Sequence, residues 1–357
     1  MLPALEFKIG CDASAKRQKV WKRVVKSPEI TVAKIADLSD TDEVFAIGSC
    51  FANEIRAVLE RVGVTVHPTI DPDLGELFLD EVKVNPRWGV WDERVHYQCF
   101  TPFTIQQEVE TALGARQAEA ESVFECRFKG KKVFVDPYRR SVYARSREDL
   151  LQIRERMNQR VRQGIARAKV IVMTLGLVEA FKIKGSDGFL AEYNPHISGE
   201  KLEFVNATYE QALEALTRTV DQILAAYPQK MIVVTVSPVP IARTFSDTDA
   251  ITATMRGKSI LRSCADTLAQ RHNEVHYWPS YEYAMWSGNA FSEDDVRHIC
   301  PNAVVKITSA FCRAFFSESI ARRLVAMRDS QTEELVGATS SWFGLKDRLR
   351  LPFRRAA

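Results

Sequence analysis

The feature that most limits the fold of this chain is a recurring pair of segments, a short apolar run and an amphipathic stretch of helical length. Short runs rich in apolar residues occupy positions 44–47, 170–175, 231–236 and 275–278. Apolar residues spaced three and four apart occupy positions 51–62, 150–168, 209–227, 258–271 and 302–325. Runs without polar alternation are typical of strands buried on both faces, and parallel strands joined through helices require right-handed crossovers. The sequence therefore predicts a three-layer α/β/α fold around a parallel sheet.

Two long stretches interrupt this alternation. Residues 64–145 are rich in proline and aromatic residues, with a short helix predicted at 104–113 and a hairpin at 122–135. Residues 182–206 are predicted to consist mainly of loops. Long connections with little regular structure are commonly insertions or lids over a functional site. We therefore expect residues 64–145 to form an insertion or lid.

Both ends of the chain carry basic segments outside the predicted α/β domain, which spans residues 44–320. Residues 1–43 are polar and basic, and we expect a solvated extension lying on the body. Residues 321–357 are expected to hold the end of the last helix and a tail. Basic and apolar residues are interleaved over 342–355, which fits either peripheral contact with an anionic surface such as the inner membrane or a disordered solvated tail.

Charge and cysteine content exclude several classes of function. Lys and Arg number 49 against 46 Asp and Glu, and a net charge of +3 is too balanced for a nucleic-acid partner. The seven cysteines include no CxxC pair, so neither a disulfide framework nor a zinc ribbon is predicted. The histidines show no metal-ligand spacing, so no metal site is predicted. With no signal-peptide pattern and no apolar run of about 18 residues, we expect a cytoplasmic protein.

The predicted strand ends define where chemistry is expected, because ligands of open parallel sheets bind beyond the carboxyl ends of the strands. At the first of these ends, Gly48-Ser49-Cys50 lies between a strand and a helix. A thiol in that position loses its proton more readily, and a serine there is open to activation by a base. The alternative is structural: Ser49 caps the helix, and Cys50 is a small buried side chain.

A second candidate element, Asp295-x-x-His298, lies in a predicted loop ahead of the last long helix. An acid three residues before a histidine folds back to hold the ring, which leaves the other ring nitrogen free to act as a base. Such spacing also arises by chance. Together with the Gly48-Ser49-Cys50 turn, it predicts a nucleophile, a base and an orienting acid at one edge of the sheet.

Residues 48–52 spell GSCFA, and the sequence resembles the GSCFA family. The other blocks that carry the resemblance are Thr174-Leu175-Gly176, Asn194-Pro195-His196, residues 235–240, Lys258-Ser259, residues 279–282 and Asp295-x-x-His298. The likeness covers residues 44–315 in consistent order. That family is related to the SGNH, or GDSL-like, hydrolases and acyltransferases. The resemblance therefore implies a flavodoxin-like α/β/α fold and an acyl-ester site.

The resemblance also implies roles for individual residues. In the SGNH pattern, the first strand is followed by Gly-Asp-Ser, and the serine is the nucleophile. Matching the glycine to Gly48 places Cys50 at the nucleophile position, whereas a slip of one residue places Ser49 there. On either register, His298 is the implied base and Asp295 its orienting acid.

The implied oxyanion hole is less complete in this sequence. The SGNH pattern uses the backbone N–H of the nucleophile, a second N–H from a glycine and an asparagine side chain. Gly176 matches the glycine, but the asparagine expected two residues later is replaced by Val178. Asn194 or His196 is the candidate donor from the next loop, unless this Asn-Pro element is only a turn. Ser237, beside a proline-rich loop, is a candidate polar contact at the rim.

These implications predict an acyl-ester hydrolase or O-acyltransferase that acts on a carbohydrate or polysaccharide precursor through a covalent acyl-enzyme. No cofactor is expected, apart from an acyl-thioester donor such as acyl-CoA if the enzyme is a transferase. Because the chain departs from the pattern at two positions, a non-catalytic glycan- or nucleotide-binding module on the same fold stays open. A membrane-surface scaffold acting through the tail is the third alternative.

Overall fold

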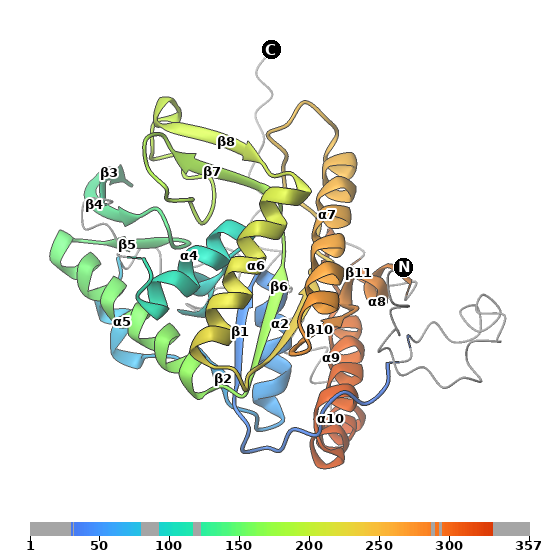
Figure 1. The fold of residues 1–357 in the computed structure, drawn as a ribbon. Helices are drawn as coiled ribbons and strands as arrows, with labels where there is room; N and C mark the ends of the chain where they lie inside the picture. The colour runs from blue at the N-terminus through green and yellow to red at the C-terminus, as the bar shows by residue number, and fades with distance from the viewer. Residues whose placement is uncertain are drawn as a thin grey trace.

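A computed structural model of the chain describes residues 30, 32–79, 93–116, 123–286, 290–292 and 295–330. Its centre is a five-stranded sheet in the order β2-β1-β6-β9-β10, and all neighbouring strands are parallel (Figure 1). These strands are β1 (Val44–Gly48), β2 (Val66–His67), β6 (Val170–Leu175), β9 (Met231–Val236) and β10 (Val275–Trp278). If the five strands of this sheet alone are counted from 1 to 5 along the chain, their order is 2-1-3-4-5, which is the order of flavodoxin-like folds. The predicted three-layer α/β/α fold is confirmed.

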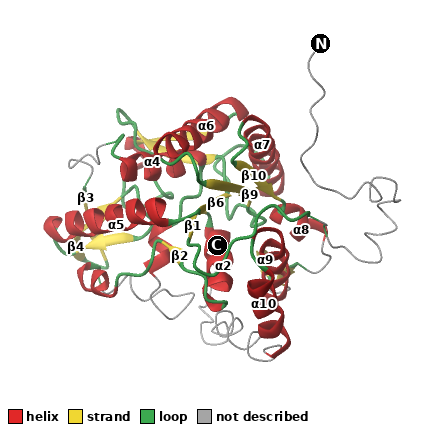
Figure 2. Ribbon diagram, turned by 60° about the horizontal axis from the view of Figure 1, so that its bottom comes forward, coloured by secondary structure: helices red, strands yellow, loops and turns green. Residues whose placement is uncertain are grey.

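Helices cover both faces of the sheet (Figure 2). One face packs against α4 (Pro102–Leu113), α5 (Arg147–Arg167), α6 (Tyr209–Ala226) and α7 (Ala250–Arg271). The other face packs against α2 (Cys50–Arg61), α8 (Ser280–Trp286), α9 (Pro301–Phe315) and α10 (Glu318–Ser330). The strands are buried on both faces because each alternates its side chains between these two cores: Ile171 and Met173 join one, Val170 and Val172 the other.

The stretch 64–145 contributes more regular structure than its sequence predicts. It supplies β2, the short 3-10 helices at Pro72–Leu77 and Glu93–Tyr97, and α4, whose predicted bounds were close. The predicted hairpin is confirmed as β3 (Phe124–Phe128) and β4 (Lys131–Asp136), to which β5 (Val142–Ala144) adds a third antiparallel strand.

The prediction of a loop-rich stretch at 182–206 is wrong at both of its ends. Antiparallel strands β7 (Glu179–Ile183) and β8 (Leu202–Asn206) enclose it, and a 3-10 helix spans Gly199–Lys201. Phe181 and Phe204 pair directly across the two strands, with ring centroids 5.4 Å apart. Cross-strand aromatic pairs of this kind stabilise a two-stranded ribbon outside the main sheet.

The single final helix predicted at 302–325 is two helices, α9 and α10. The break lies at Phe316, where the N-terminal segment intervenes: Leu38 bonds to the backbone of the residues on either side of it, Phe315 and Ser317. Its N–H donates to Phe315 O at 2.9 Å, and its carbonyl accepts from Ser317 N at 2.8 Å. Leu38 is also buried. The described part of the predicted solvated extension is therefore packed into the body, whereas residues 1–29 and the predicted tail contact at 342–355 lie outside the described residues.

The loop predicted to carry Asp295 and His298 is a strand. β12 (Asp295–Ile299) pairs antiparallel with β11 (Phe291–Ser292) directly before α9. A strand rises about 3.3 Å per residue, so the Cα atoms of positions 295 and 298 lie about 10 Å apart. The fold-back turn expected from the spacing is therefore replaced by an extended backbone.

The amino edge of the sheet holds a cluster of paired charges. Glu43, next to β1, binds His67 Nε2 at 2.7 Å and Arg167 at 2.6 Å. The hydrogen bond from Arg167 and then the one from His67 lower the pKa of the Glu43 carboxyl. Lys230, directly before β9, donates to the carbonyls of Ala166 and Ala168. Each of these groups has a partner of opposite charge or polarity.

Candidate functional site

The carboxyl edge of the sheet begins with a turn that only glycine allows. Gly48 ends β1 with φ +132°, and a Cβ at this position would lie 2.1 Å from Thr174 O. Both the backbone angle and the close approach exclude larger residues. The chain then leaves the sheet: Ser49 N still donates to Thr174 O at 3.0 Å, while Ser49 O accepts from Ala52 N as α2 starts. Cys50 is thus the first residue of a helix.

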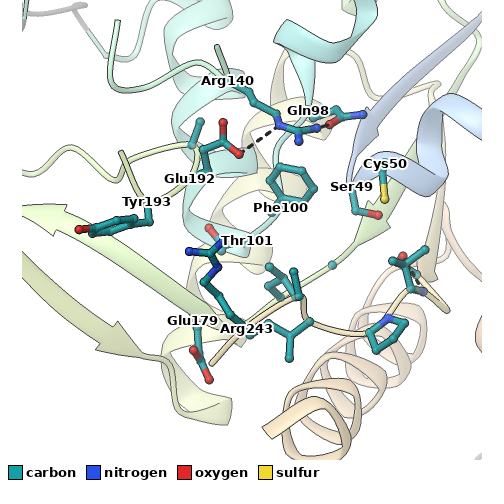
Figure 3. A pocket seen from close by; sticks show the side chains of 18 of the residues that line it. Ser49, Cys50, Gln98, Phe100, Thr101, Arg140, Glu179, Glu192, Tyr193 and Arg243 are labelled. Carbon is teal, nitrogen blue, oxygen red and sulfur yellow. Dashed lines mark hydrogen bonds and ion pairs between the residues drawn. The ribbon is translucent and has the colours of Figure 1, made fainter. Parts of the chain in front are cut away.

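A cavity of about 650 Å³ opens at this edge, above the point where the strand order reverses between β1 and β6. Five of the residues singled out from the sequence line it: Ser49, Cys50, Gly176, Ser237 and His298. Figure 3 shows Ser49 and Cys50 on one side of this cavity, with Tyr193 and Glu179 on the opposite side. Open α/β sheets bind their ligands at such a reversal of strand order.

Hydrogen bonds hold the backbone of Gly176 in one orientation. Leu175 O accepts from the N–H of Ser237, the residue after β9, at 2.8 Å. Because C=O and N–H point in opposite directions across a trans peptide, the N–H of Gly176 points away from β9, toward β1. There β1 has already turned into α2, so this N–H faces the Ser49 turn. A Cβ on Gly176 would lie 2.9 Å from Ser49 Cβ, which shows how close the two segments are.

The Cys50 thiol is half-buried at the N-terminus of α2. Burial and then the neighbouring Glu54 raise the pKa of the thiol, while Arg140, Lys258 and Arg297 act to lower it. The helix terminus acts in the same direction as these three cations, because it favours an anion. Since burial and Glu54 outweigh them, the net shift of the thiol pKa is upward, and the thiol needs a base to become a nucleophile.

Ser49 does not play the capping role that its position suggests. It is the N-cap residue of α2, yet its side chain makes no capping hydrogen bond. Its hydroxyl oxygen is fully buried and has no hydrogen-bond partner among the described residues. Buried hydroxyls are normally satisfied, so this orphaned hydroxyl, on a residue that lines the cavity, is an exception that packing alone does not explain.

His298 reaches the cavity from β12, where it is half-buried. Its neighbours Arg297 and Ile299 line the same cavity. Asp295 lies three positions earlier on β12. The side chain of Asp295 lies outside the described residues, so its role as orienting acid stays a prediction.

The Asn194-Pro195-His196 element is a turn. Asn194 Oδ1 accepts from His196 N at 2.9 Å, and its Nδ2 donates to the Tyr143 hydroxyl at 3.3 Å. His196 is exposed and packs edge-on against Phe128 and Tyr143. Only Pro195 of the three lines the cavity. The geometry therefore favours the turn interpretation of Asn194 and His196 over the predicted oxyanion role.

Ser237 lines the cavity in a different way. Its hydroxyl is buried and accepts from Val239 N at 3.3 Å, while its own N–H holds Leu175 O. It therefore acts on the site through the backbone, by fixing the loop after β9 and the peptide ahead of Gly176.

The sequence reasoning gave no role to two charged groups at this edge of the sheet, although Lys258 belongs to one of the blocks that carry the resemblance. Arg140, between β4 and β5, bonds to Gln98 and to Glu192 (3.1 Å) and lies 5.3 Å above the Phe100 ring. Lys258 on α7 donates to Gly176 O at 2.8 Å. The sequence signal for Lys258 is its place on the apolar stripe of that helix, three residues before Leu261.

The far wall of the cavity is aromatic. Phe181, Tyr193 and Phe245 pack together, with centroids 4.7 to 5.2 Å apart. Glu179 anchors this wall, because its carboxylate accepts from Thr244 Oγ1 at 2.6 Å and from Phe245 N at 2.9 Å. Of the aromatic residues at 97–103 in the predicted insertion, Phe100 lines the cavity, whereas Tyr97 and Phe103 pack inward.

The described part of the chain shows no group of three or more His, Cys, Asp or Glu side chains arranged to hold a metal ion. Five of its six cysteines are free thiols: Cys50, Cys99, Cys126, Cys264 and Cys312. Within the same residues, every helix is too short or too polar to cross a bilayer.

The fold and the site together define a class: a flavodoxin-like α/β/α protein with a ligand cavity at its strand-order reversal. The GSCFA family model matches residues 43–311, which is most of the chain. The protein belongs to the GSCFA family. No curated protein matches its sequence.

Proposed function

We propose that this protein is an acyl-ester enzyme, a hydrolase or an O-acyltransferase, that works through a covalent acyl-enzyme. The observation that carries the proposal is the meeting of Ser49, Cys50, Gly176 and His298 at one cavity. A nucleophile, a base and a backbone donor around a common space are the parts that acyl transfer requires. The relation to SGNH enzymes that the sequence resemblance implies points to the same reaction class.

In the proposed reaction, His298 removes the proton of the Cys50 thiol, and the sulfur attacks the acyl carbonyl of the donor. Gly176 N–H, which faces the turn, stabilises the oxyanion that forms on the carbonyl oxygen. The C–O bond of an ester donor, or the C–S bond of a thioester donor, then breaks, and His298 returns the proton to the leaving alcohol or thiol. A thioester remains on Cys50 until water or an acceptor hydroxyl takes the acyl group. Ser49 is the alternative nucleophile, with an ester as its intermediate.

The proposed acceptor is a carbohydrate or polysaccharide precursor. Partly exposed aromatic rings support this choice, because Tyr193 (39% exposed) and Phe245 (41%) offer apolar faces at the rim. Arg140, Glu192 and Arg243 add polar groups around the same opening. In the transferase version, the donor is an acyl thioester such as acyl-CoA. Reduced thiols fit a cytoplasmic site of action, which is part of the proposal.

Intact-mass and peptide mass spectrometry after incubation with p-nitrophenyl acetate test the proposal. The parent protein is expected to gain one acetyl group on Cys50, and Cys50→Ala is expected to lose it. If acetylation persists in Cys50→Ala but not in Ser49→Ala, the serine is the nucleophile. Equal acetylation of the parent and both variants contradicts the covalent mechanism.

One observation favours a second candidate, a non-catalytic binding module on the same fold. Burial and Glu54 raise the pKa of the Cys50 thiol, which opposes thiolate formation. In that case the cavity binds a glycan or a nucleotide without turning it over. Unchanged ligand affinity in His298→Ala, combined with no ester turnover by the parent, would support this candidate.

A further inference from the structure

One arginine of the cavity wall is left without a partner in the part of the chain that the structure describes. Arg243 lines the cavity from the loop after β9, and none of the described residues forms a hydrogen bond or an ion pair with its side chain. Figure 3 shows this side chain extended into the cavity. A guanidinium is always charged and has five N–H donors, so Arg243 presents an unused cation to a ligand.

The other charged or titratable side chains of the cavity lining all interact with other groups of the protein: Glu54, Arg140, Glu179, Glu192, Arg297 and His298. Glu192 accepts from Arg140 Nε at 3.1 Å. Glu179 accepts from Thr244 Oγ1 and from the backbone N–H of Phe245. Neither of these two acids pairs with Arg243, so its positive charge remains available to a ligand.

The loop that carries Arg243 is fixed on both sides of this residue. Ahead of it, Ile241 N donates to Thr254 Oγ1 on α7 at 3.3 Å. After it, residues 244–246 donate three hydrogen bonds to the Glu179 carboxylate at the start of β7. Binding costs less entropy when the loop is already ordered. The backbone of Arg243 is therefore prepared for recognition.

An apolar ring surface lies on the same side of the cavity. The rings of Tyr193 and Phe245 are partly exposed, with centroids 5.2 Å apart, and Phe245 follows Arg243 by two residues. In Figure 3, Tyr193 and Arg243 lie across the cavity from Cys50. A cavity of about 650 Å³ holds a ligand large enough to reach both sides. Such a ligand would meet Cys50 at one end, and an arginine and aromatic rings at the other.

We propose that Arg243 recognises an anionic group, a carboxylate or a phosphate, on the ligand of this cavity. A guanidinium binds either group through two parallel N–H···O bonds. The anion has one of two sources: an acidic or phosphorylated sugar acceptor, or the phosphates of a nucleotide-bearing acyl-thioester donor. The inference rests on the proposed function for its meaning as substrate selectivity, but the binding itself is measurable without acyl transfer.

Ligand-observed NMR titration tests the proposal with three anionic probes, namely glucuronate, glucose 6-phosphate and, under reducing conditions, coenzyme A. Glucose and pantetheine are the neutral counterparts. At least one anionic probe is expected to bind the parent more tightly than its counterpart, and Arg243→Gln is expected to weaken that binding about tenfold to a hundredfold, because hydrogen bonds between two charged groups are strong. Binding of a sugar anion would identify the acceptor as the source, and binding of coenzyme A the donor.

Arg271→Gln is the matched control. Arg271 is also exposed and has no ion-pair or hydrogen-bond partner among the described residues, but it is the last residue of α7. That helix has 22 residues and is about 33 Å long, so a charge at its far end is screened from the cavity. Its replacement should leave each affinity unchanged. Arg243→Lys keeps the charge without the planar fork, and its affinity is expected between those of the parent and Arg243→Gln.

Two results would overturn the proposal. One is that every anionic probe binds the parent no more tightly than its neutral counterpart, and the other is an affinity unchanged in Arg243→Gln. A failure of the proposed function gives a different result. If an anion binds through Arg243 but p-nitrophenyl acetate leaves no acyl group on the parent, the acyl-ester function fails and the recognition role stands. If the acyl-enzyme forms while the anionic probes show no preference, only the role of Arg243 fails.

Discussion

The two edges of the central sheet bury polar groups in different ways. At the amino edge, Glu43 is paired with His67 and Arg167, and Lys230 donates to two carbonyls. At the carboxyl edge, the hydroxyls of Ser49 and Thr174 are buried without a partner among the described residues. The four groups named at the first edge all have partners. The second leaves hydrogen-bonding capacity unused around a cavity.

This difference separates groups that stabilise the fold from groups prepared for a ligand. Buried polar atoms without partners reduce stability, and they persist mainly where function requires them. Lys258 and Lys230 make the same contrast with one residue type, since both are buried and both donate to carbonyls. Of the two, only Lys258 donates to a residue that lines the cavity, Gly176.

The largest expected contrast concerns the two histidines. His298→Ala is expected to slow acyl-enzyme formation by about 10²–10⁴-fold, because the proposed reaction loses its general base. His67→Ala removes a histidine from the amino edge and should leave that rate within about twofold, while lowering the stability by about 1–3 kcal/mol. Acetylation rates and urea unfolding of both variants provide the comparison. An equal loss of rate in the two variants would contradict the division between the edges.

A second contrast concerns two glycines with positive φ. Gly48→Ala is expected to destabilise the protein by about 3 kcal/mol or more, because its Cβ would meet the Thr174 backbone at 2.1 Å. Gly63→Ala, at φ +87° between α2 and β2, meets only the Arg323 side chain at 3.2 Å and should cost about 1 kcal/mol. Thermal unfolding measures both. Equal destabilisation of the two variants would show that the close packing of β1 and β6 at Gly48 contributes nothing to the stability of the fold.

The third contrast depends on pH. Glu43→Gln is expected to lower stability by about 1 kcal/mol at pH 7, with no change in the acetylation rate. Because the folded protein lowers the pKa of Glu43, this stabilisation is present above the unfolded-state value of 4.5 and is lost as the pH falls through the lower folded-state value. The stability difference between the parent and Glu43→Gln should therefore vanish toward acidic pH. A difference that is independent of pH would contradict the ionic account.

The smallest expected effect is at Ser49. Ser49→Ala removes a buried hydroxyl that has no protein partner and should raise stability by about 0.5–1 kcal/mol. The expected change in stability is opposite in sign to the change expected for Glu43→Gln. Urea unfolding in the absence of ligand measures it. A loss of stability would indicate that the hydroxyl is satisfied in the free protein, and the contrast between the edges would weaken.

Much of the fold followed from the sequence because its strands are apolar without interruption. Positions 170–175, 231–236 and 275–278 were predicted with the observed bounds. The break between α9 and α10 was missed because it depends on Leu38, which is distant in sequence and bonds to the backbone there. Helical periodicity carries no information about such a contact.

The site was predictable where the strand-end rule applied. Gly48, Ser49, Cys50 and Gly176 follow β1 and β6 directly, so parallel pairing brings them together. Asn194 was assigned to the site as a replacement for the asparagine missing at position 178, but the chain between β7 and β8 holds this residue in a turn. Arg140 lies in a turn of the insertion and reaches the cavity only through tertiary packing, for which the sequence offers no local signal.

The anchor at Glu179 has a consequence for the aromatic wall. One carboxylate ties the start of β7 to residues 244–246, so it fixes the two sides of the wall, Phe181 and Phe245, to each other. Loss of this carboxylate would therefore loosen Phe245 in the wall while the central strands and the Gly48 turn keep their own contacts. The shape of the opening and the geometry of the turn at Cys50 are then set by different contacts of one scaffold.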